Sequence, residues 1–378
     1  MQQGRIPSLD GLRALSAGLV VSGHAAEAIG AVAAVRGLYL VRAAGSMGVT
    51  VFFVVSGFLI TGLLERERDR TGTIRLGAFW FRRAFRILPA CWAFLAAMAV
   101  LAAAGTAHIP LPYFSRAFFF LTDYLGLPDH WWLGHLWSLS AEEQFYLLWP
   151  PALLLLGRRR ALRVALALFL AAPLLRLGTW WLAPGLRPSM AFMLHTRIDA
   201  VMLGCVFALA RAEGKGRAVL GALSRGPVAA AAAAFLFLGA PLLFRAFAWD
   251  YRFWLGYQAE AVAAGAVLLW ATGHPAALAG RVLNSAPAVH LGRISFGLYL
   301  WQQPFLNREL GWSPGMVLAG VGAALLMAEV SRRFVEEPAQ ALRRWLERVR
   351  TLPVPRDHHG VDAAANGEVA HHLHEARL

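Results

Sequence analysis

Charged side chains are scarce in this sequence: Asp, Glu, Lys and Arg make up 15% of its 378 residues, whereas hydrophobic residues make up 58%. Soluble domains carry roughly 25% charged and about 45–50% apolar residues. The mean hydropathy of +0.52 also reflects more apolar side chain than one soluble core requires. The composition therefore argues against two or three soluble domains and indicates an integral membrane protein.

Cysteine and lysine are almost absent. The two cysteines, Cys91 and Cys205, both lie in apolar segments, which argues against a disulfide framework and against a zinc site. Lys215 is the only lysine, so the net charge of +14 comes from arginine. Because the arginines lie in short segments between apolar stretches, they favour membrane topology over nucleic-acid binding.

Ten apolar stretches approach the length of about 20 residues that a helix needs to cross a bilayer. The first contains His24 and Glu27, charges that a cleavable signal peptide lacks, so we expect a retained helix. The shorter run at 115–126 is expected to be re-entrant or interfacial. The expected spans are 14–35, 46–64, 86–104, 136–156, 161–183, 191–210, 227–247, 255–272, 287–306 and 313–334.

The basic residues are distributed unevenly between the two sides of these spans. With the N-terminus in the cytoplasm, the cytoplasmic segments hold 26 basic residues and the opposite segments hold 7. This asymmetry follows the positive-inside rule. We therefore expect an all-α, polytopic transmembrane helix bundle of ten spans over residues 1–345, with both N- and C-termini cytoplasmic.

The composition changes near residue 351. Residues 351–378 are rich in Pro, Gly, Ala and charge, which predicts a disordered cytoplasmic tail. A histidine cluster in the tail could bind a metal, but an ordinary disordered segment is the simpler interpretation, and we predict no metal site. The cluster consists of His358, His359, His371, His372 and His374.

Ionisable residues inside spans are costly, so each is a candidate for function. Arg13 and His24 are eleven residues apart, close to three helical turns, so they share one helix face about 16 Å apart along the axis. An elongated ligand such as an acyl-CoA fits this spacing, with its phosphates at Arg13 and its thioester at His24. A neutral imidazole can act as a general base. The alternative is a structural histidine bonded to a neighbouring helix.

Arg83 and Arg86, in FWFRRAFRILP, are spaced to share a helix face. Guanidinium groups match phosphate oxygens well, so the pair is a candidate anion site at the cytoplasmic entrance. An interfacial belt of aromatic and arginine side chains is the alternative, and it accounts well for Arg82.

Glu142 and Glu143 interrupt an apolar helix in HLWSLSAEEQFYLLWP. Adjacent helix positions point about 100° apart, so only one carboxylate can face a ligand squarely. That carboxylate could orient His24 or bind a sugar hydroxyl, and an ion pair between helices is the alternative. Lesser candidates are Arg197, Asp199 and Ser56, the last of which interhelical bonding explains more simply.

Several long motifs resemble those of the acyltransferase 3 family of bacterial membrane O-acyltransferases. They are IPSLDGLRALSAGLVVSGH, GVTVFFVVSGFLI, RRAFRILP, HLWSLSAEEQFYLLWP, RIDAVMLG, LGRISFGLYLW and RRFVEEP, and they extend over residues 5–345 in the family's order.

The resemblance implies transfer of an acyl group, usually acetyl, from cytoplasmic acyl-CoA to a hydroxyl group. The implied acceptor is a sugar of a surface polysaccharide, a lipid-linked glycan or a glycosylated natural product. The family's Arg-ten-His element falls on Arg13 and His24, its Arg-x-x-Arg element on Arg83 and Arg86, and its acidic element on Glu142 and Glu143.

Two departures from the family pattern are visible. Gln302 stands where many relatives have a histidine, so we assign that position no catalytic role. Some relatives also carry an additional C-terminal domain, whereas here a short tail follows, so the chain is expected to work alone or with a separate partner. We expect a multi-pass protein of the inner (plasma) membrane. The alternative from another class is a glycan-lipid transporter or flippase, which broken helices in matching halves of the sequence would favour, and we find no such halves. A non-catalytic sensor or scaffold is a further alternative, but it has no need of Arg13 and His24 on one face.

Overall fold

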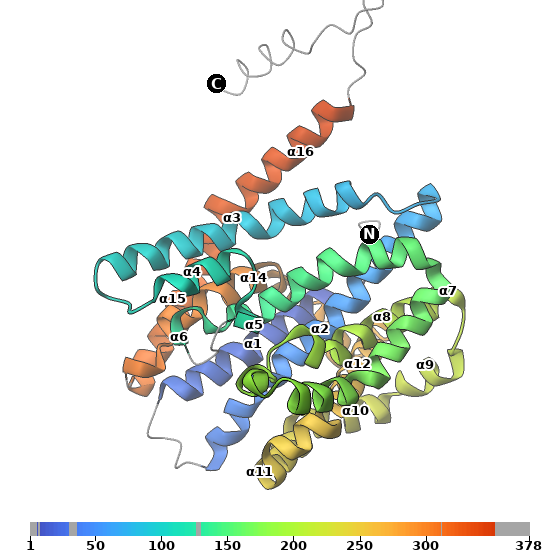
Figure 1. The fold of residues 1–378 in the computed structure, drawn as a ribbon, viewed down its shortest axis with the longest axis horizontal. Coiled ribbons are helices and arrows are strands. Elements are labelled where there is room, and N and C mark those ends of the chain that lie inside the picture. The colour runs from blue at the N-terminus through green and yellow to red at the C-terminus, as the bar shows by residue number, and fades with distance from the viewer. Residues whose placement is uncertain (1–5, 7, 30–35, 126–129, 311, 352–378) are drawn as a thin grey trace, which may run out of the picture.

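The computed structural model describes residues 6, 8–29, 36–125, 130–310 and 312–351 (Figure 1). Of the described residues, 88% are helical and none lies in a strand. This confirms the predicted all-α class. The predicted tail at 351–378 lies outside the described residues except for its first residue, which ends the last helix.

Four helices form the centre of the bundle: α1 (Leu9–Ala28), α2 (Arg36–Thr71), α8 (Ile198–Glu213) and α14 (Ala286–Phe305). Helix α1 packs on α2 and α14, and α2 packs on α8. Glycine allows the close contact between α2 and α8, because a Cβ added to Gly57 would lie 2.0 Å from the carbonyl oxygen of Val201. The glycine-containing run around Ser56 thus allows the two helices to pack closely.

Helix α7 (Leu136–Leu182) is a continuous ribbon of 47 residues with one non-helical residue, Gly157, at φ 69° and ψ 165°. The chain reverses direction there (Figure 1). Glycine adopts such positive φ without the steric cost of a Cβ. The two spans predicted at 136–156 and 161–183 are therefore the two arms of this helical hairpin.

The short helices α4 (Leu111–Phe118), α5 (Thr122–Leu125) and α6 (Trp131–Gly134) follow helix α3 (Leu76–Ala103). The run at 115–126, predicted not to span, falls in the first two. Two 3₁₀ turns, η2 (Pro184–Ser189) and η3 (Leu194–Thr196), connect α7 to α8.

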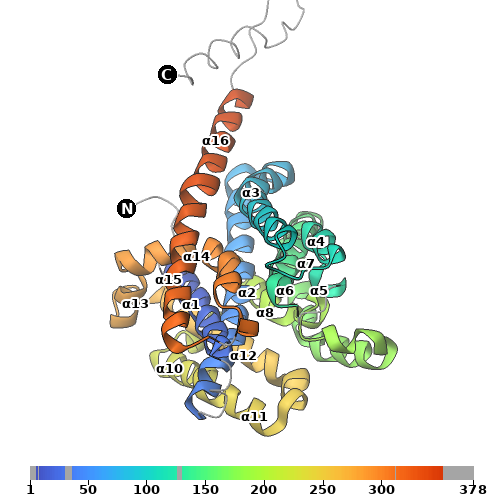
Figure 2. The same ribbon diagram turned by 90° about the vertical axis from the view of Figure 1, so that its left-hand side faces the viewer.

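The C-terminal half continues with α9 (Arg217–Leu223), α10 (Gly226–Ala234), the π-helical turn η4 (Phe235–Gly239), α11 (Ala240–Tyr251), the π-helical turn η5 (Arg252–Gly256), α12 (Tyr257–Gly273) and α13 (Leu278–Leu283). After α14 come η6 (Arg308–Leu310), α15 (Pro314–Ser331), the π-helical turn η7 (Arg332–Glu336) and α16 (Glu337–Thr351). The last three form one long rod, in which α15 packs on α14 and α16 projects beyond the bundle (Figure 2).

Within the described ranges, five helical stretches are both long and apolar enough to cross a membrane: Tyr39–Thr71, Leu76–Ala103, Trp131–Leu182, Gly226–Ala248 and Pro314–Val349. The described residues of each of the ten predicted stretches are largely helical, and residues 30–35 of the first stretch lie outside the described part. Helices α8 and α12, at 16 and 17 residues, are shorter than a usual span. Helices α1 and α14 are long enough but carry more polar side chains. A membrane helix bundle is therefore supported, while the count of ten and the cytoplasmic termini stay predictions.

Candidate functional site

The predicted cationic residues meet at one cavity between α1, α2, α3 and α7. Its volume is about 280 Å³, and its wall includes Arg13, Arg83, Arg86 and Glu142. The helices bring together residues that are more than a hundred positions apart in the chain. Four of the six residues that the sequence nominates therefore line one space.

A larger basic cavity of about 690 Å³ adjoins the first and shares Leu63, Arg83 and Arg86 with it. Seven arginines and a single acid, Glu67, line this space, which we call the basic mouth. Arg82 there lies 3.6 Å from Glu67 and is 41% exposed, in line with its interpretation as a surface residue. The arginines of the basic mouth are Arg66, Arg70, Arg75, Arg82, Arg83, Arg86 and Arg343.

In the opposite direction the first cavity narrows to a passage of about 30 Å³, room for about one water molecule. The two spaces share Phe52, Leu139, Glu142 and Phe296. Ser16 and Val20 of α1 and Ser295 and Tyr299 of α14 line the passage from two sides. A ligand that moves further in has to push these side chains apart.

His24 lies one helical turn beyond Val20, at the end of this passage. Its Nδ1 is 2.8 Å from Oε1 of Gln302, which lies one turn beyond Tyr299 on α14. The imidazole also makes an edge contact with Trp131 at 5.3 Å between ring centroids. If Nδ1 carries the proton and donates it to Gln302, Nε2 keeps its lone pair and can accept a proton.

Gln302 is therefore a residue that the sequence interpretation undervalued. Gln302, rather than a glutamate, is the hydrogen-bonding partner of His24, a contact that the sequence interpretation did not include. A glutamine side chain carries no charge, so Gln302 does not stand out among the ionisable residues of the spans. The sequence signal that could have identified it is its position next to a motif shared with the family.

Glu142 forms short hydrogen bonds with the hydroxyl groups of Ser56 and Tyr146. Tyr146 in turn lies under the guanidinium of Arg83, whose Cζ is 4.2 Å from the ring centroid. Ser56 is thus both an interhelical partner and part of the cavity wall. Glu142 anchors the wall of the cationic cavity and does not bond to His24.

Glu143 points elsewhere, as the angle between adjacent helix positions predicts. It is not part of the wall of the cavity or of the passage. One of its oxygens is buried and has no hydrogen-bond partner among the described residues. The geometry therefore favours Glu142 over Glu143 as the acid that faces the site.

Arg197 and Asp199 belong to a second cationic centre, the buried arginine cluster, consisting of Arg176, Arg197, Arg252, Asp199 and Glu260 around the ring of Tyr257. Nη1 of Arg176 is 2.8 Å from Asp199, and Nε of Arg252 is 3.7 Å from Glu260. The Cζ of Arg197 is 3.9 Å from the Tyr257 centroid. Within the described part of the chain, no three His, Cys, Asp or Glu side chains gather as a metal site.

The arginines of the two cavities and His24 thus lie along one internal path of a helical membrane bundle. The family model described as an acyltransferase domain matches residues 6–307, so the chain belongs to this acyltransferase family. This confirms the resemblance found in the motifs.

Two relatives are informative. The chain is 28% identical over 361 residues to the peptidoglycan O-acetyltransferase OatA of Listeria monocytogenes, covering 88% of this chain and 55% of that protein. It is 29% identical over 367 residues to the O-acetyltransferase OatA of Staphylococcus aureus, covering 88% of this chain and 57% of that protein. The chain thus spans about half the length of the curated relatives it matches. No solved structure matches it.

Proposed function

We propose that this protein is a multi-pass O-acyltransferase of the inner (plasma) membrane. Its donor is cytoplasmic acyl-CoA, most simply acetyl-CoA, and its acceptor is a hydroxyl group of a cell-envelope glycan. The names of the relatives from Listeria and Staphylococcus support an acetyl group, and that of the Listeria protein supports a peptidoglycan acceptor. Other sugar acceptors in surface polysaccharides, lipid-linked glycans or glycosylated natural products belong to the same proposal.

One observation carries the proposal: the basic mouth, the cationic cavity and the narrow passage follow one another and lead toward His24. An acyl-CoA has the matching order of parts, with a phosphate-rich nucleotide, a long thin arm and a terminal thioester. The arginines suit the phosphates because guanidinium groups bind them in charge-assisted pairs. The length from Arg13 to His24, about 16 Å along the helix, suits the extended arm.

The proposed reaction is a direct transfer. Nε2 of His24 takes the proton of the acceptor hydroxyl as its oxygen attacks the thioester carbon. A carbon–oxygen bond forms, the carbon–sulfur bond breaks, and the thiolate of CoA leaves with the proton from the imidazolium. An acyl-histidine intermediate is a second route to the same products, in which Nε2 attacks the thioester first.

The two polar partners of the path take different parts in this proposal. Gln302 holds the imidazole with Nε2 toward the reacting groups, which is a positioning role. Glu142, bonded to Ser56 and Tyr146, balances the charge of the arginines while leaving them available to the donor. The roles of Arg13, Arg83 and Arg86 are donor binding, and Glu143 receives no catalytic part.

The test uses purified protein in lipid nanodiscs. Release of free CoA thiol from acetyl-CoA is followed with and without a cell-envelope glycan extract, for the wild type and for His24→Ala. Extract-dependent release that disappears in a folded His24→Ala variant supports the transferase. The same test separates it from a glycan-lipid transporter, which would release no thiol. Full activity in folded His24→Ala protein would overturn the role of His24.

A further inference from the structure

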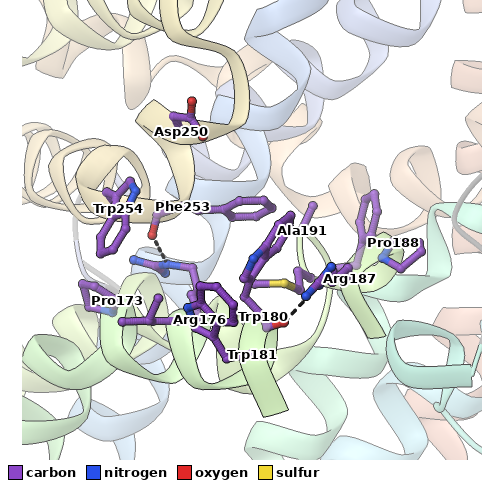
Figure 3. Close-up of a pocket in the computed structure, with 13 residues that line it drawn as sticks. Pro173, Arg176, Trp180, Trp181, Arg187, Pro188, Ala191, Asp250, Phe253 and Trp254 are labelled. Atoms are coloured by element: carbon purple, nitrogen blue, oxygen red, sulfur yellow. Dashed lines mark hydrogen bonds between the residues drawn. The ribbon is translucent and has the colours of Figure 1, made fainter. Parts of the chain in front are cut away.

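A separate cavity of about 480 Å³ lies outside the path just described (Figure 3). Its walls come from the end of α7, from the connection to α8 and from η5. We call it the aromatic cavity, because three indole rings surround it: Trp180, Trp181 and Trp254. These side chains are 39%, 68% and 55% exposed, so large flat apolar surfaces are open to a ligand.

Charged groups accompany the indoles. The Cζ of Arg187 is 4.3 Å from the centroid of Trp180, and its Nε donates a hydrogen bond of 2.9 Å to the carbonyl of Trp180. Asp250 lies at the rim on the facing element (Figure 3). The cavity thus offers a guanidinium held against one indole and a carboxylate elsewhere in its lining.

Arg176 forms part of the inner wall and is 1% exposed. Its Nη1 bonds to Asp199 and to the carbonyl of Thr196, and its Nε bonds to the carbonyl of Phe253. Its Nη2 is buried and has no hydrogen-bond partner within the described residues. A buried donor without a partner costs free energy, so a ligand oxygen at this wall would relieve that cost.

The aromatic cavity lies at the same end of the bundle as His24. Helix α7 begins beside the catalytic end, where the amide of His135 bonds to Gln303. It turns back at Gly157, so its second arm runs back alongside the first (Figure 1). Phe192 of the cavity wall packs on Trp137 at 5.1 Å, and Trp137 precedes Ser138 of the narrow passage.

Tryptophans at the end of a membrane helix also occur as interfacial belts. A belt of this kind faces lipid and needs neither a concave wall nor a fully buried arginine. A sugar ring needs both features found here. Its C–H faces can lie on indole planes, and its hydroxyls need hydrogen-bond donors and acceptors such as Arg187, Arg176 and Asp250.

We propose that the aromatic cavity is a binding subsite for the acceptor glycan, holding a pyranose ring of the same chain whose neighbouring sugar is acylated near His24. This inference rests on the proposed function. It assigns acceptor recognition to residues that neither the sequence motifs nor the donor path include.

The binding test uses a β-1,4-linked N-acetylglucosamine tetramer as the probe and protein in nanodiscs, read by titration calorimetry. Trp181→Ala and Trp254→Ala are each expected to lower the affinity about tenfold, as loss of an aromatic anchor does. Trp92→Ala is the matched control, because Trp92 is 44% exposed on α3 and lines none of the cavities described here. Trp254→Phe should recover most of the affinity.

In the transfer assay the same variants should raise the acceptor KM about tenfold and leave the acetyl-CoA KM unchanged. Unchanged tetramer affinity and acceptor KM in both Trp→Ala variants, with an active wild type, would overturn the subsite while the proposed function stands. An equal loss of affinity in Trp92→Ala would also overturn it. Trp-dependent binding without any thiol release in the wild type would uphold the subsite and defeat the transferase.

Discussion

The cationic cavity and the buried arginine cluster each contain three arginines inside the bundle, but they differ in the acidic partners that these arginines have. In the buried cluster, Arg176 lies against Asp199 and Arg252 near Glu260, and both acids are 0% exposed. In the cationic cavity, Arg13, Arg83 and Arg86 share the wall with one acid, Glu142, which is bonded to two hydroxyl groups.

The difference separates stabilising arginines from ligand-binding ones. A buried charge costs several kcal/mol unless a partner compensates it, so the close pair of Arg176 and Asp199 stabilises the fold, although Nη2 of Arg176 keeps no hydrogen-bond partner among the described residues. An excess of positive charge around an open space is tolerated where an anion enters and supplies the missing partner. Residue type alone therefore does not identify a ligand site inside a membrane protein. An excess of arginines over acidic side chains around one cavity does.

The largest effect is expected at the end of the donor path. His24→Ala removes the proposed base and should lower transfer about 10²- to 10⁴-fold, the usual contribution of general base catalysis. Ser22→Ala, on the exposed side of the same helix, is the matched control and should retain activity. Transfer rates are compared at equal amounts of folded protein, and equal rates in the two variants would remove His24 from the mechanism.

Breaking the buried arginine cluster should damage folding rather than donor binding. Asp199→Ala leaves Arg176 without its carboxylate and should cost about 3–5 kcal/mol of stability. Glu213→Ala, which removes a pair whose Arg159 is 80% exposed, should cost no more than about 1 kcal/mol. Thermal unfolding in detergent measures both. A stable Asp199→Ala protein with a raised acetyl-CoA KM would mean that the two clusters share one role.

Loss of the orienting amide should act on the chemical step. Gln302→Leu removes the partner of Nδ1 and should lower kcat about 10- to 100-fold, corresponding to about 1–3 kcal/mol for an unsatisfied polar group. Gln302→Glu keeps an acceptor and should retain more activity. Steady-state kinetics measure kcat and KM separately, and the acetyl-CoA KM should stay constant while kcat falls. A change confined to KM would assign Gln302 to donor binding instead.

A smaller effect is expected from single arginines of the cationic cavity. Arg83→Ala or Arg86→Ala should raise the acetyl-CoA KM about tenfold, in the range of one lost charge-assisted hydrogen bond. The double variant should be weaker still. Arg160→Ala, an exposed arginine outside these cavities, is the control. The proposed donor site would be contradicted by unchanged KM values in both single variants.

The sequence carried much of this account because apolar stretches and intramembrane charges are strong local signals. Helix geometry places Arg13 and His24 on one face, and it explains why Glu142 and Glu143 diverge. The contact of His24 with Gln302 joins positions 278 residues apart, which no local pattern encodes. The pairing of Arg176 with Asp199 likewise depends on how α7 folds back at Gly157.

The central claim is that one donor extends from the basic mouth to His24. A short acyl-CoA with a photoreactive diazirine on its acyl chain tests it directly, through mass spectrometry of the labelled peptides. We expect labels on α1 near His24 or on α14 near Gln302, competed by acetyl-CoA and lost in the double Arg83→Ala, Arg86→Ala variant. Competable labels confined to the aromatic cavity, or to helices away from the path, would contradict it.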